Sequence, residues 1–416
     1  MTTCIDCSMC DKECKQDIFE NFRDKYQAIS EFHYSPNIHS LPTNLILGLT
    51  NNCNLACPYC FVQQNSQTMT YKIAEDAIKW AIENYQKKSF PKNIPNITFF
   101  GGEPLLQFNN IIKPLVEKWH DQVTFSITTN GILLNEDIVD FFHLYNVSIL
   151  LSFDGVEEVQ NKQRPGKTFN SFDTILKNIP YLLIRFPYTV MRATLTKNSL
   201  PYMYESVLMA AELGFKTITF CPNAFESWGP EEEKIYSNQL EKITLYIYKQ
   251  LHKNIFPIQV NPIIKVFDNI NKAINSELFF NNNILRCGLG TTTCAITVDG
   301  KIIPCQEKLS HPTIILGDIY KGIDPFIHKN YLINYFNKVN NITCDRCCFD
   351  KEKLQCLSDI CPSRLEDLNY KFSSSECIFT QQAYKATARL HLLCSKSNNK
   401  LWREYFNELE EEQNND

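Results

Sequence analysis

The sequence has no long apolar run and no excess of positive charge, and each absence excludes a class of protein. None of its 416 residues belong to an apolar stretch approaching the roughly 18 residues of a membrane span, which excludes a membrane-spanning protein. The 41 lysines and arginines stand against 46 aspartates and glutamates, a formal charge of −5, which argues against binding nucleic acid by neutralising phosphates. The first residues show no basic start followed by an apolar stretch, so no secretory signal and a cytoplasmic protein are expected.

Cysteine is nearly absent from the middle of the chain and concentrated elsewhere. Between Phe61 and Arg286 only Cys221 occurs, although the whole sequence has 18 cysteines. This total is about 4% of the chain, below the roughly 8–10% of secreted disulfide scaffolds. In a reducing cytosol, clustered thiols more often hold metal or carry out redox chemistry than pair as disulfides. The clusters therefore predict metal or redox sites.

The central part of the sequence alternates short apolar runs with longer segments of helical periodicity. This alternation predicts βα units around a parallel sheet over residues 44–260. Strands are predicted at Leu45–Leu49, Ile97–Phe100, Thr124–Thr128, Val147–Phe153, Thr189–Leu195 and Thr217–Phe220. Helices are predicted at Thr70–Lys87, Leu105–Trp119, Asn135–Leu144, Phe172–Leu183, Leu200–Leu213 and Glu231–Lys253. Six units are too few for a closed eight-fold barrel, so the expected fold class is α/β, a partial (β/α)6 TIM-type barrel.

Three further segments flank the predicted barrel. Residues 1–43 form an N-terminal segment that contains four cysteines. Residues 285–380 are rich in Cys, Gly, Pro and Asp, which predicts a loop-rich domain ordered by something other than a large core. Residues 381–416 predict a C-terminal helix and an acidic tail, whose charges are expected to be solvated.

Three cysteines follow the first predicted strand, within LTNNCNLACPYCF. Cys53, Cys57 and Cys60 are spaced CxxxCxxC, and the short chain between them brings their sulfurs toward one small object. Three thiolates suit an iron–sulfur cube in which one iron has no protein ligand. The alternatives are a zinc ion completed by a distant fourth ligand, and unligated thiols. The loop follows the C-terminal end of a strand, where βα barrels place their chemistry.

Glycine and polar residues also follow the next predicted strands. Gly101–Pro104 read GGEP, in which glycines let a ligand approach the backbone, although a plain strand-to-helix turn is the simpler interpretation of this segment alone. Asn130 follows the third strand, and the fourth ends in SFDG with Ser152 and Asp154; Asn and Asp beside Gly are also ordinary turn formers. Arg192, within the apolar strand VMRATL, would need an anionic partner if it points inward, and an outward edge position is the alternative.

Together these residues resemble the radical S-adenosylmethionine (SAM) enzymes. The resemblance rests on CxxxCxxC, GGEP, the Asn-Gly and SFDG turns and QRPGKTFNSFDTI, and it covers about residues 44–220. It implies that the three cysteines hold a [4Fe–4S] cluster whose free iron binds SAM, from which a 5′-deoxyadenosyl radical is released. Gly102 and Glu103 would contact the SAM amino group, and Ser152 and Arg192 its ribose and carboxylate. The full set of cofactor-binding residues implied is Gly101, Gly102, Glu103, Asn130, Ser152 and Arg192.

Nine further cysteines between positions 287 and 377 resemble the SPASM extension of these enzymes, which binds two auxiliary [4Fe–4S] clusters. The resemblance assigns the first cluster to Cys287, Cys294, Cys305 and Cys361, and the second to Cys344, Cys347, Cys356 and Cys377. Eight residues separate Cys347 from Cys356 where the family usually has five, and Cys348 is an alternative to Cys347. A disulfide framework or two zinc sites would also account for the number of thiols.

The N-terminal cysteines form a separate set. Cys4, Cys7, Cys10 and Cys14 are spaced CxxCxxCxxxC, similar to bacterial ferredoxins. A further cluster, a zinc knot and a thiol-rich tail all remain open. Because only 43 residues precede the barrel, a separate protein is the expected binder of any leader peptide.

The resemblance implies an enzyme that modifies a ribosomally made peptide or protein, with a reducing donor such as flavodoxin or ferredoxin. Oxidative crosslinking through a thioether or carbon–carbon bond is the expected reaction. Formylglycine formation is an alternative, but Gln306 stands where the sulfatase-maturating branch has an Asp base, with Glu307 adjacent and Asp299 nearby. A non-enzymatic iron–sulfur electron carrier is the other alternative, and it leaves the three-cysteine site without a purpose. The sequence assigns no catalytic side chain and no particular substrate.

Overall fold

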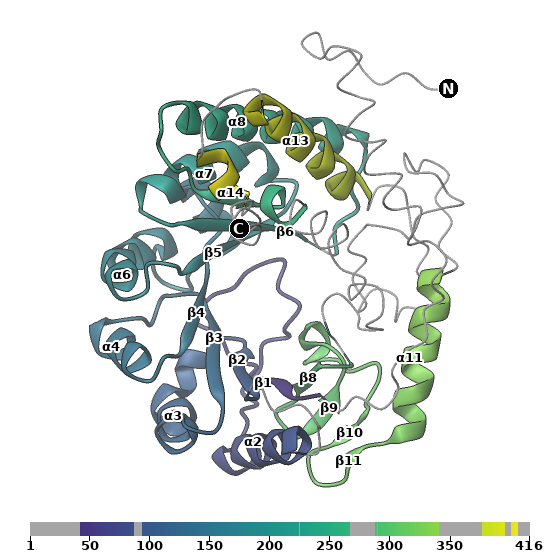
Figure 1. Cartoon of the computed structure of the whole chain (residues 1–416). Coiled ribbons are helices and arrows are strands. Elements are labelled where there is room, and N and C mark those ends of the chain that lie inside the picture. Colours follow the sequence, from purple (N-terminus) through teal and green to yellow (C-terminus); the bar gives the residue numbers. More distant parts are fainter. Residues whose placement is uncertain are drawn as a thin grey trace, which may run out of the picture.

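The computed structural model describes residues 42–86, 94–223, 225–266, 288, 290–340, 377–395 and 401–406. Within these residues one curved sheet of 11 strands forms the centre of the molecule, and helices cover its outer side (Figure 1). The strand order is β11-β10-β9-β8-β1-β2-β3-β4-β5-β6-β7. The cysteines at positions 4–14, 287 and 344–361 lie outside the described residues, so the site predictions that involve them stay predictions.

Seven parallel strands make up the barrel part of the sheet. They are β1 (Asn44–Thr50), β2 (Asn96–Gly101), β3 (Thr124–Thr129), β4 (Ser148–Ser152), β5 (Val190–Leu195), β6 (Thr217–Pro222) and β7 (Gln259–Asn261). The first six are the strands that the sequence predicts. The seventh pairs with β6, and its three residues are too few to show a strand periodicity in the sequence.

Helices follow the strands and cover the sheet. They are α2 (Tyr71–Gln86), α3 (Lys113–Trp119), α4 (Glu136–Leu144), α5 (Glu157–Gln163), α6 (Ser171–Arg185), α7 (Met203–Glu212) and α8 (Pro230–His252). A 3-10 turn (Pro104–Gln107) and a π-helical turn (Phe108–Ile112) precede α3, and a 3-10 turn (Leu200–Tyr202) precedes α7. Asn135 and Asn170 cap α4 and α6, since their side chains accept hydrogen bonds from backbone N–H groups of the first turn.

The remaining strands extend the sheet at its β1 edge. Strand β8 (Thr293–Ile296) pairs with β1 in parallel, and β9 (Lys301–Ile303), β10 (Gly317–Asp318) and β11 (Gly322–Ile323) follow in antiparallel order. A 3-10 turn (Gln306–Lys308) lies between β9 and β10, and α11 (Pro325–Asn340) follows β11. Part of the predicted cysteine-rich segment therefore continues the barrel sheet.

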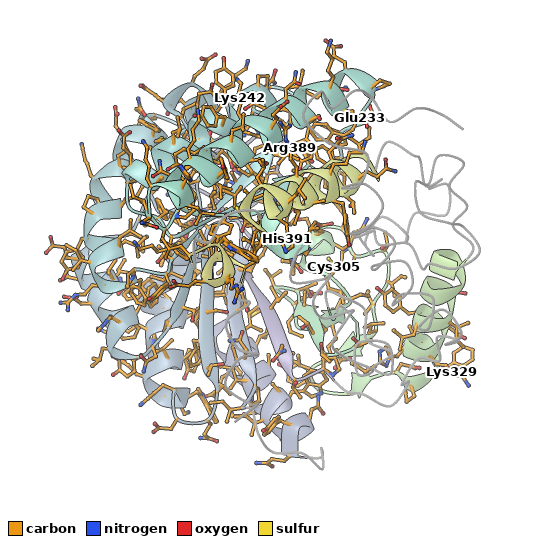
Figure 2. All side chains as sticks on the ribbon, turned by 45° about the horizontal axis from the view of Figure 1, so that its top comes forward. Glu233, Lys242, Cys305, Lys329, Arg389 and His391 are labelled. Atoms are coloured by element: carbon orange, nitrogen blue, oxygen red, sulfur yellow. The ribbon has the colours of Figure 1, made fainter. Side chains whose placement is uncertain are left out.

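Two C-terminal helices, α13 (Cys377–Ser395) and α14 (Leu401–Tyr405), pack at the other edge of the barrel. Arg389 of α13 forms a 2.7 Å ion pair with Glu241 of α8, and Gln382 donates to Glu233 at 2.8 Å. Figure 2 shows Glu233 and Arg389 where the two helices meet. Tyr405 donates its hydroxyl to the carbonyl of Ile258, which joins α14 to the chain before β7. Across the described ranges, the helices are too short or too polar to span a bilayer.

We expect the aromatic core beside the sheet to contribute strongly to stability. Phe99 is fully buried and stacks on Phe125 with 5.3 Å between ring centroids, so Phe99→Ala should lower the free energy of unfolding by about 3–5 kcal/mol. Ile184→Ala, at a side chain that is 74% exposed, should change it by less than about 0.5 kcal/mol. Urea unfolding followed by circular dichroism measures the free energy of unfolding of both variants. Equal losses of stability in the two variants would contradict this packing.

Candidate functional site

The carboxyl ends of β1 to β6 face one cavity. Parallel strands of one sheet end on the same side, so residues far apart in sequence can meet there. The cavity is lined by all nine residues predicted for the first site, Cys53, Cys57, Cys60, Gly101, Gly102, Glu103, Asn130, Ser152 and Arg192. The structure thus brings these residues together, and what each one binds stays a prediction.

The cysteine loop, residues 51–62, has an irregular backbone that is anchored at both ends. At its start, Asn51 donates from Nδ2 to Gln67 Oε1 at 3.2 Å, and Thr50 donates from Oγ1 to the Gln67 carbonyl at 3.1 Å. Further along, Gln64 donates from Nε2 to the Leu55 carbonyl at 2.6 Å. The chain that returns after the third cysteine therefore holds the loop in place.

The two glycines of GGEP let the end of β2 lie directly against the start of the cysteine loop. The Gly102 N–H donates to the Thr50 carbonyl at 2.7 Å, and the Glu103 N–H donates to the Asn52 carbonyl at 2.9 Å. A Cβ atom on Gly102 would lie 2.2 Å from the Asn52 oxygen, which is too close for any side chain. Gly101 has φ +133°, a conformation that favours glycine. The motif thus has a structural role as well as lining the cavity.

Glu103 is the most enclosed acid of the cavity, with 1% of its surface exposed. Its carboxylate accepts hydrogen bonds from the N–H of Leu105 at 3.0 Å, the hydroxyl of Thr129 at 2.8 Å and the N–H of Asn130 at 2.9 Å. Burial raises the pKa of this carboxyl to about 7, although the three donors oppose the shift. The carboxyl therefore links the ends of β2 and β3 and titrates near neutral pH.

Burial also disfavours the charged forms of the three thiols. It raises the pKa of Cys53 to about 11 and that of Cys57 to about 12, and it raises the pKa of Cys60 as well. Metal ligation needs thiolates, so metal binding here must release protons. Ligation should therefore become easier as the pH rises.

The donor set of the cavity fits an iron–sulfur cluster. Within the described parts of the chain, no three Cys, His, Asp or Glu side chains are spaced for a single metal ion, so the fit is judged on the cavity that the thiols share. Asn130 Nδ2 lies 3.7 Å from Cys53 Sγ, and among the described residues the buried Nδ2 of Asn54 has no hydrogen-bond partner. An amide donor beside cysteine sulfur suits a cluster, whose sulfurs accept hydrogen bonds.

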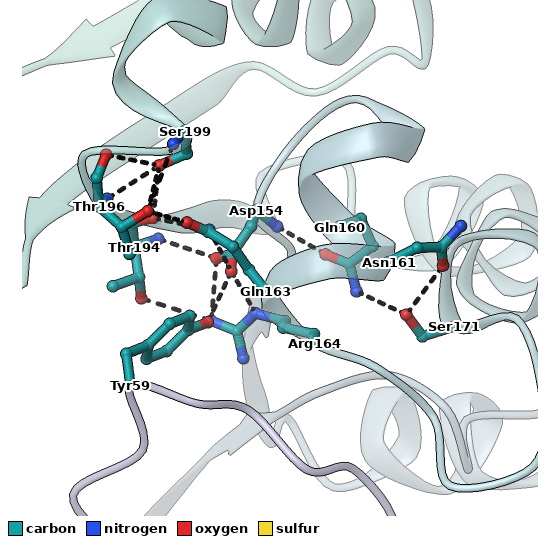
Figure 3. A network of polar contacts seen from close by, with 10 residues as sticks. All are labelled: Tyr59, Asp154, Gln160, Asn161, Gln163, Arg164, Ser171, Thr194, Thr196 and Ser199. Atoms are coloured by element: carbon teal, nitrogen blue, oxygen red, sulfur yellow. Dashed lines mark hydrogen bonds and ion pairs between the residues drawn. The ribbon is translucent and has the colours of Figure 1, made fainter.

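A buried polar network that the sequence did not predict lies behind the cysteine loop (Figure 3). Asp154 accepts hydrogen bonds from the Tyr59 hydroxyl at 2.6 Å, from Gln163 Nε2 at 2.9 Å and from the Thr194 N–H at 2.8 Å. Arg164 forms an ion pair with the same carboxylate, Nε lying 3.0 Å from Oδ2. Asp154 and Arg164 belong to the SFDG and QRPGK segments, which contributed to the family resemblance, but the sequence assigned no role to these two side chains.

Further residues that were not predicted as cofactor-binding also line the cavity. These include Phe61, Phe100, Cys221, Asn223, Phe225 and Glu307. Of the two acids near Gln306 that the sequence suggested as bases, Glu307 lines the cavity, whereas Asp299 pairs with Lys301 at 2.8 Å on the turn between β8 and β9. The predicted auxiliary ligands Cys294 and Cys305 are both buried, and Cys377 begins α13.

Comparisons with known proteins bear on this site. Residues 47–198 match the family model described as the Radical SAM superfamily. An uncharacterized protein of Methanocaldococcus jannaschii is 32% identical over 189 residues, 42% of this chain and 61% of that protein. A cysteine-type anaerobic sulfatase-maturating enzyme of Clostridium novyi is 26% identical over 285 residues, 63% of this chain and 72% of that enzyme. The structure of native anSMEcpe with bound AdoMet and Cp18Cys peptide has a TM-score of 0.67 at 18% identity, covering 88% of this chain and 99% of that chain.

These findings confirm the family resemblance over the barrel and the predicted fold class. The superfamily implies a [4Fe–4S] cluster and SAM, for which the three thiols and the surrounding cavity supply a suitable donor set. The chain spans less than two thirds of the M. jannaschii relative. The auxiliary clusters and their ligands stay predictions.

We expect Gly102→Ala to disrupt the contact between β2 and the cysteine loop. The added Cβ must displace the Asn52 backbone, so the substitution should cost about 1–3 kcal/mol and reduce the iron retained after anaerobic reconstitution. Gly229→Ala is the matched control, because among the described residues its added Cβ would meet only the end of the Glu232 side chain, at 3.2 Å. Thermal melts and iron analysis measure both variants, and normal iron retention by Gly102→Ala would contradict the expected role.

Proposed function

We propose, on the premise that this chain is an enzyme of the radical SAM superfamily, that it oxidatively modifies a ribosomally made peptide or protein. The observation that carries the proposal is the convergence of three thiols, the GGEP glycines and polar strand ends in one cavity. Oxidative crosslinking, through a thioether or a carbon–carbon bond, is the reaction we favour. Support for a peptide substrate comes from the neighbour anSMEcpe, whose structure includes a peptide.

Each group of cavity residues has a part in this proposal. When bound, the cluster and SAM would supply a 5′-deoxyadenosyl radical that abstracts a substrate hydrogen, and auxiliary clusters would accept the electron of the second oxidation step. The thiols of Cys53, Cys57 and Cys60 hold the cluster. Gly101, Gly102, Glu103 and Asn130 form the wall from β2 and β3, and Ser152 and Arg192 form the wall from β4 and β5.

Aromatic side chains line part of the cavity, and the proposal is that a peptide side chain packs against them and helps to exclude water. Phe61 and Phe100 stack nearly parallel, with 6.2 Å between centroids, and Phe225 is 63% exposed at the same cavity. Excluding water protects a radical from side reactions. A reducing donor such as flavodoxin or ferredoxin and a separate leader-peptide-binding protein belong to the same proposal.

Glu307 is the proposed acceptor of the proton that a substrate loses during oxidation. Among the described residues that line the cavity, the carboxylates are Glu103 and Glu307. The Glu103 carboxylate links the ends of β2 and β3 through three hydrogen bonds, whereas Glu307 adjoins Gln306, the position of the Asp base in the sulfatase-maturating branch, so Glu307 is the proposed base.

A second candidate is formylglycine formation, which the C. novyi relative and the carboxylate of Glu307 favour. Mass spectrometry of a co-expressed peptide separates the two reactions. Crosslinking removes two hydrogen atoms per site, whereas formylglycine formation from cysteine also exchanges sulfur for oxygen. A short open reading frame beside this gene would supply the peptide for the experiment.

We expect the reconstituted protein to bind about 12 irons per chain, or about 16 if the N-terminal cysteines bind a further cluster. Cys57→Ala should lose about 4 of these and stop the conversion of SAM to 5′-deoxyadenosine. Cys394→Ala is the matched control, because this buried thiol of α13 is outside the predicted ligand sets. This variant should keep its full iron content and still convert SAM to 5′-deoxyadenosine. A colourless, zinc-loaded protein, or 5′-deoxyadenosine formation by Cys57→Ala, would overturn the assignment.

We expect Glu307→Gln to separate radical formation from product formation. The amide cannot accept a proton, so the modified peptide should fall by about 10²- to 10⁴-fold while 5′-deoxyadenosine is still produced. Asp299→Asn, which removes the other nearby acid, should leave product formation unchanged because Asp299 does not line the cavity. Quantitative mass spectrometry checks both, and the opposite pattern would assign the base to Asp299.

A further inference from the structure

The segment Arg164–Lys167 lies directly against the cysteine loop, although the proposed chemistry gives it no role. The Pro165 carbonyl accepts a hydrogen bond from the Ala56 N–H at 3.0 Å, and Gly166 forms an isolated antiparallel bridge with Leu55. Lys167 donates from Nζ to the Cys53 carbonyl at 2.9 Å. Backbone contacts therefore hold the first half of the cysteine loop against this segment.

A buried ion pair holds the second half of the loop. The side chains of Arg164 and Asp154 are 9% and 0% exposed, and NH2 of the guanidinium donates to Oδ1 at 3.0 Å. Tyr59, between the second and third cysteines, donates its hydroxyl to Asp154 Oδ2 at 2.6 Å, and the guanidinium lies over its ring at 5.5 Å (Figure 3). Tyr59 is thus held at both its ring and its hydroxyl.

The positive charge of Arg164 faces the sulfur site. Among the described residues that line the cavity, the cations are Arg164 and Arg192. Its guanidinium lies over the ring of Tyr59, which stands between Cys57 and Cys60 in the sequence. An arginine remains charged at every accessible pH, so it is suited to compensating thiolates that ligate metal.

We propose that Arg164, oriented by Asp154, is a positioning residue for the cluster of the cysteine loop. It fixes the loop through Tyr59, and its charge stabilises the ligating thiolates and raises the reduction potential of the cluster. This inference rests on the proposed function, because it requires a cluster at Cys53, Cys57 and Cys60.

The two effects, loop fixation and charge, can be separated because they respond differently to substitution. Loss of Arg164 removes both the fixation and the positive charge, so the cluster should be lost faster and its potential should become more negative. Loss of the Asp154 charge weakens the fixation but removes a negative charge, so the potential should become less negative. A role confined to folding would not produce shifts of opposite sign.

The experiment compares four variants of the full chain after anaerobic reconstitution. Arg164→Met removes the charge and Arg164→Lys keeps it without the bidentate geometry, while Asp154→Asn and Tyr59→Phe test the partners. The matched control is Arg185→Met, which breaks the 2.8 Å pair with Asp140 on the surface. The electron paramagnetic resonance signal that Cys57→Ala abolishes identifies the cluster of this loop.

We expect Arg164→Met to release this cluster to an iron chelator about 10- to 100-fold faster and to shift its midpoint potential to more negative values. Asp154→Asn should also accelerate release but shift the potential in the opposite direction. Arg164→Lys should keep the potential near that of the parent protein, and Tyr59→Phe should accelerate release without a shift. Arg185→Met should change neither quantity.

Two results would overturn the inference. Equal potentials in Arg164→Met, Asp154→Asn and the parent protein would remove the electrostatic role, and release no faster than in Arg185→Met would remove the positioning role. If Arg164→Met does not fold, Arg164→Lys and Tyr59→Phe decide the positioning role, and Asp154→Asn decides the electrostatic role. If Cys57→Ala abolishes no signal, the proposed function itself fails, which is a distinguishable outcome.

Discussion

Parallel strands of one sheet all finish on the same side, and the candidate site depends on this constraint. The cysteine loop follows β1, GGEP follows β2, and Asn130 follows β3, so one cavity receives a contribution from each strand. The helices lie on the outer side of the sheet (Figure 1). The extension β8 to β11 uses the free edge of β1, which brings Glu307 to the same cavity.

An irregular loop can hold three thiols in place only if its backbone has partners elsewhere. Here those partners come from three directions: the glycine end of β2, the returning chain around Gln67, and the segment Arg164–Lys167. Each contact is short and uses main-chain groups, so it constrains the loop without occupying the thiols. The close approach at Gly102 shows why a residue without a side chain is needed there.

The same cavity combines burial with charge. Burial disfavours thiolates at the cysteines and the carboxylate at Glu103, whereas Arg164 supplies a permanent positive charge. Asp154 compensates that charge, and hydrogen bonds satisfy its carboxylate, which makes a buried ion pair tolerable. Protonation and charge in this site are therefore set by tertiary neighbours and not by residue type alone.

The sequence by itself determined the six strands β1 to β6 and the main helices, because apolar periodicity is a local property of the chain. It also determined that Cys53, Cys57 and Cys60 lie close together, because only a short chain separates them. It left open whether GGEP was a turn or a site, and whether Asp299 or Glu307 was near the chemistry. It also gave no sign of the contact between Tyr59 and Asp154, which are 95 positions apart. Only the tertiary structure showed that GGEP and Glu307 contribute to the cavity lining and that Tyr59 meets Asp154, because contacts across the sheet depend on which strands become neighbours, and no local pattern of residues records that.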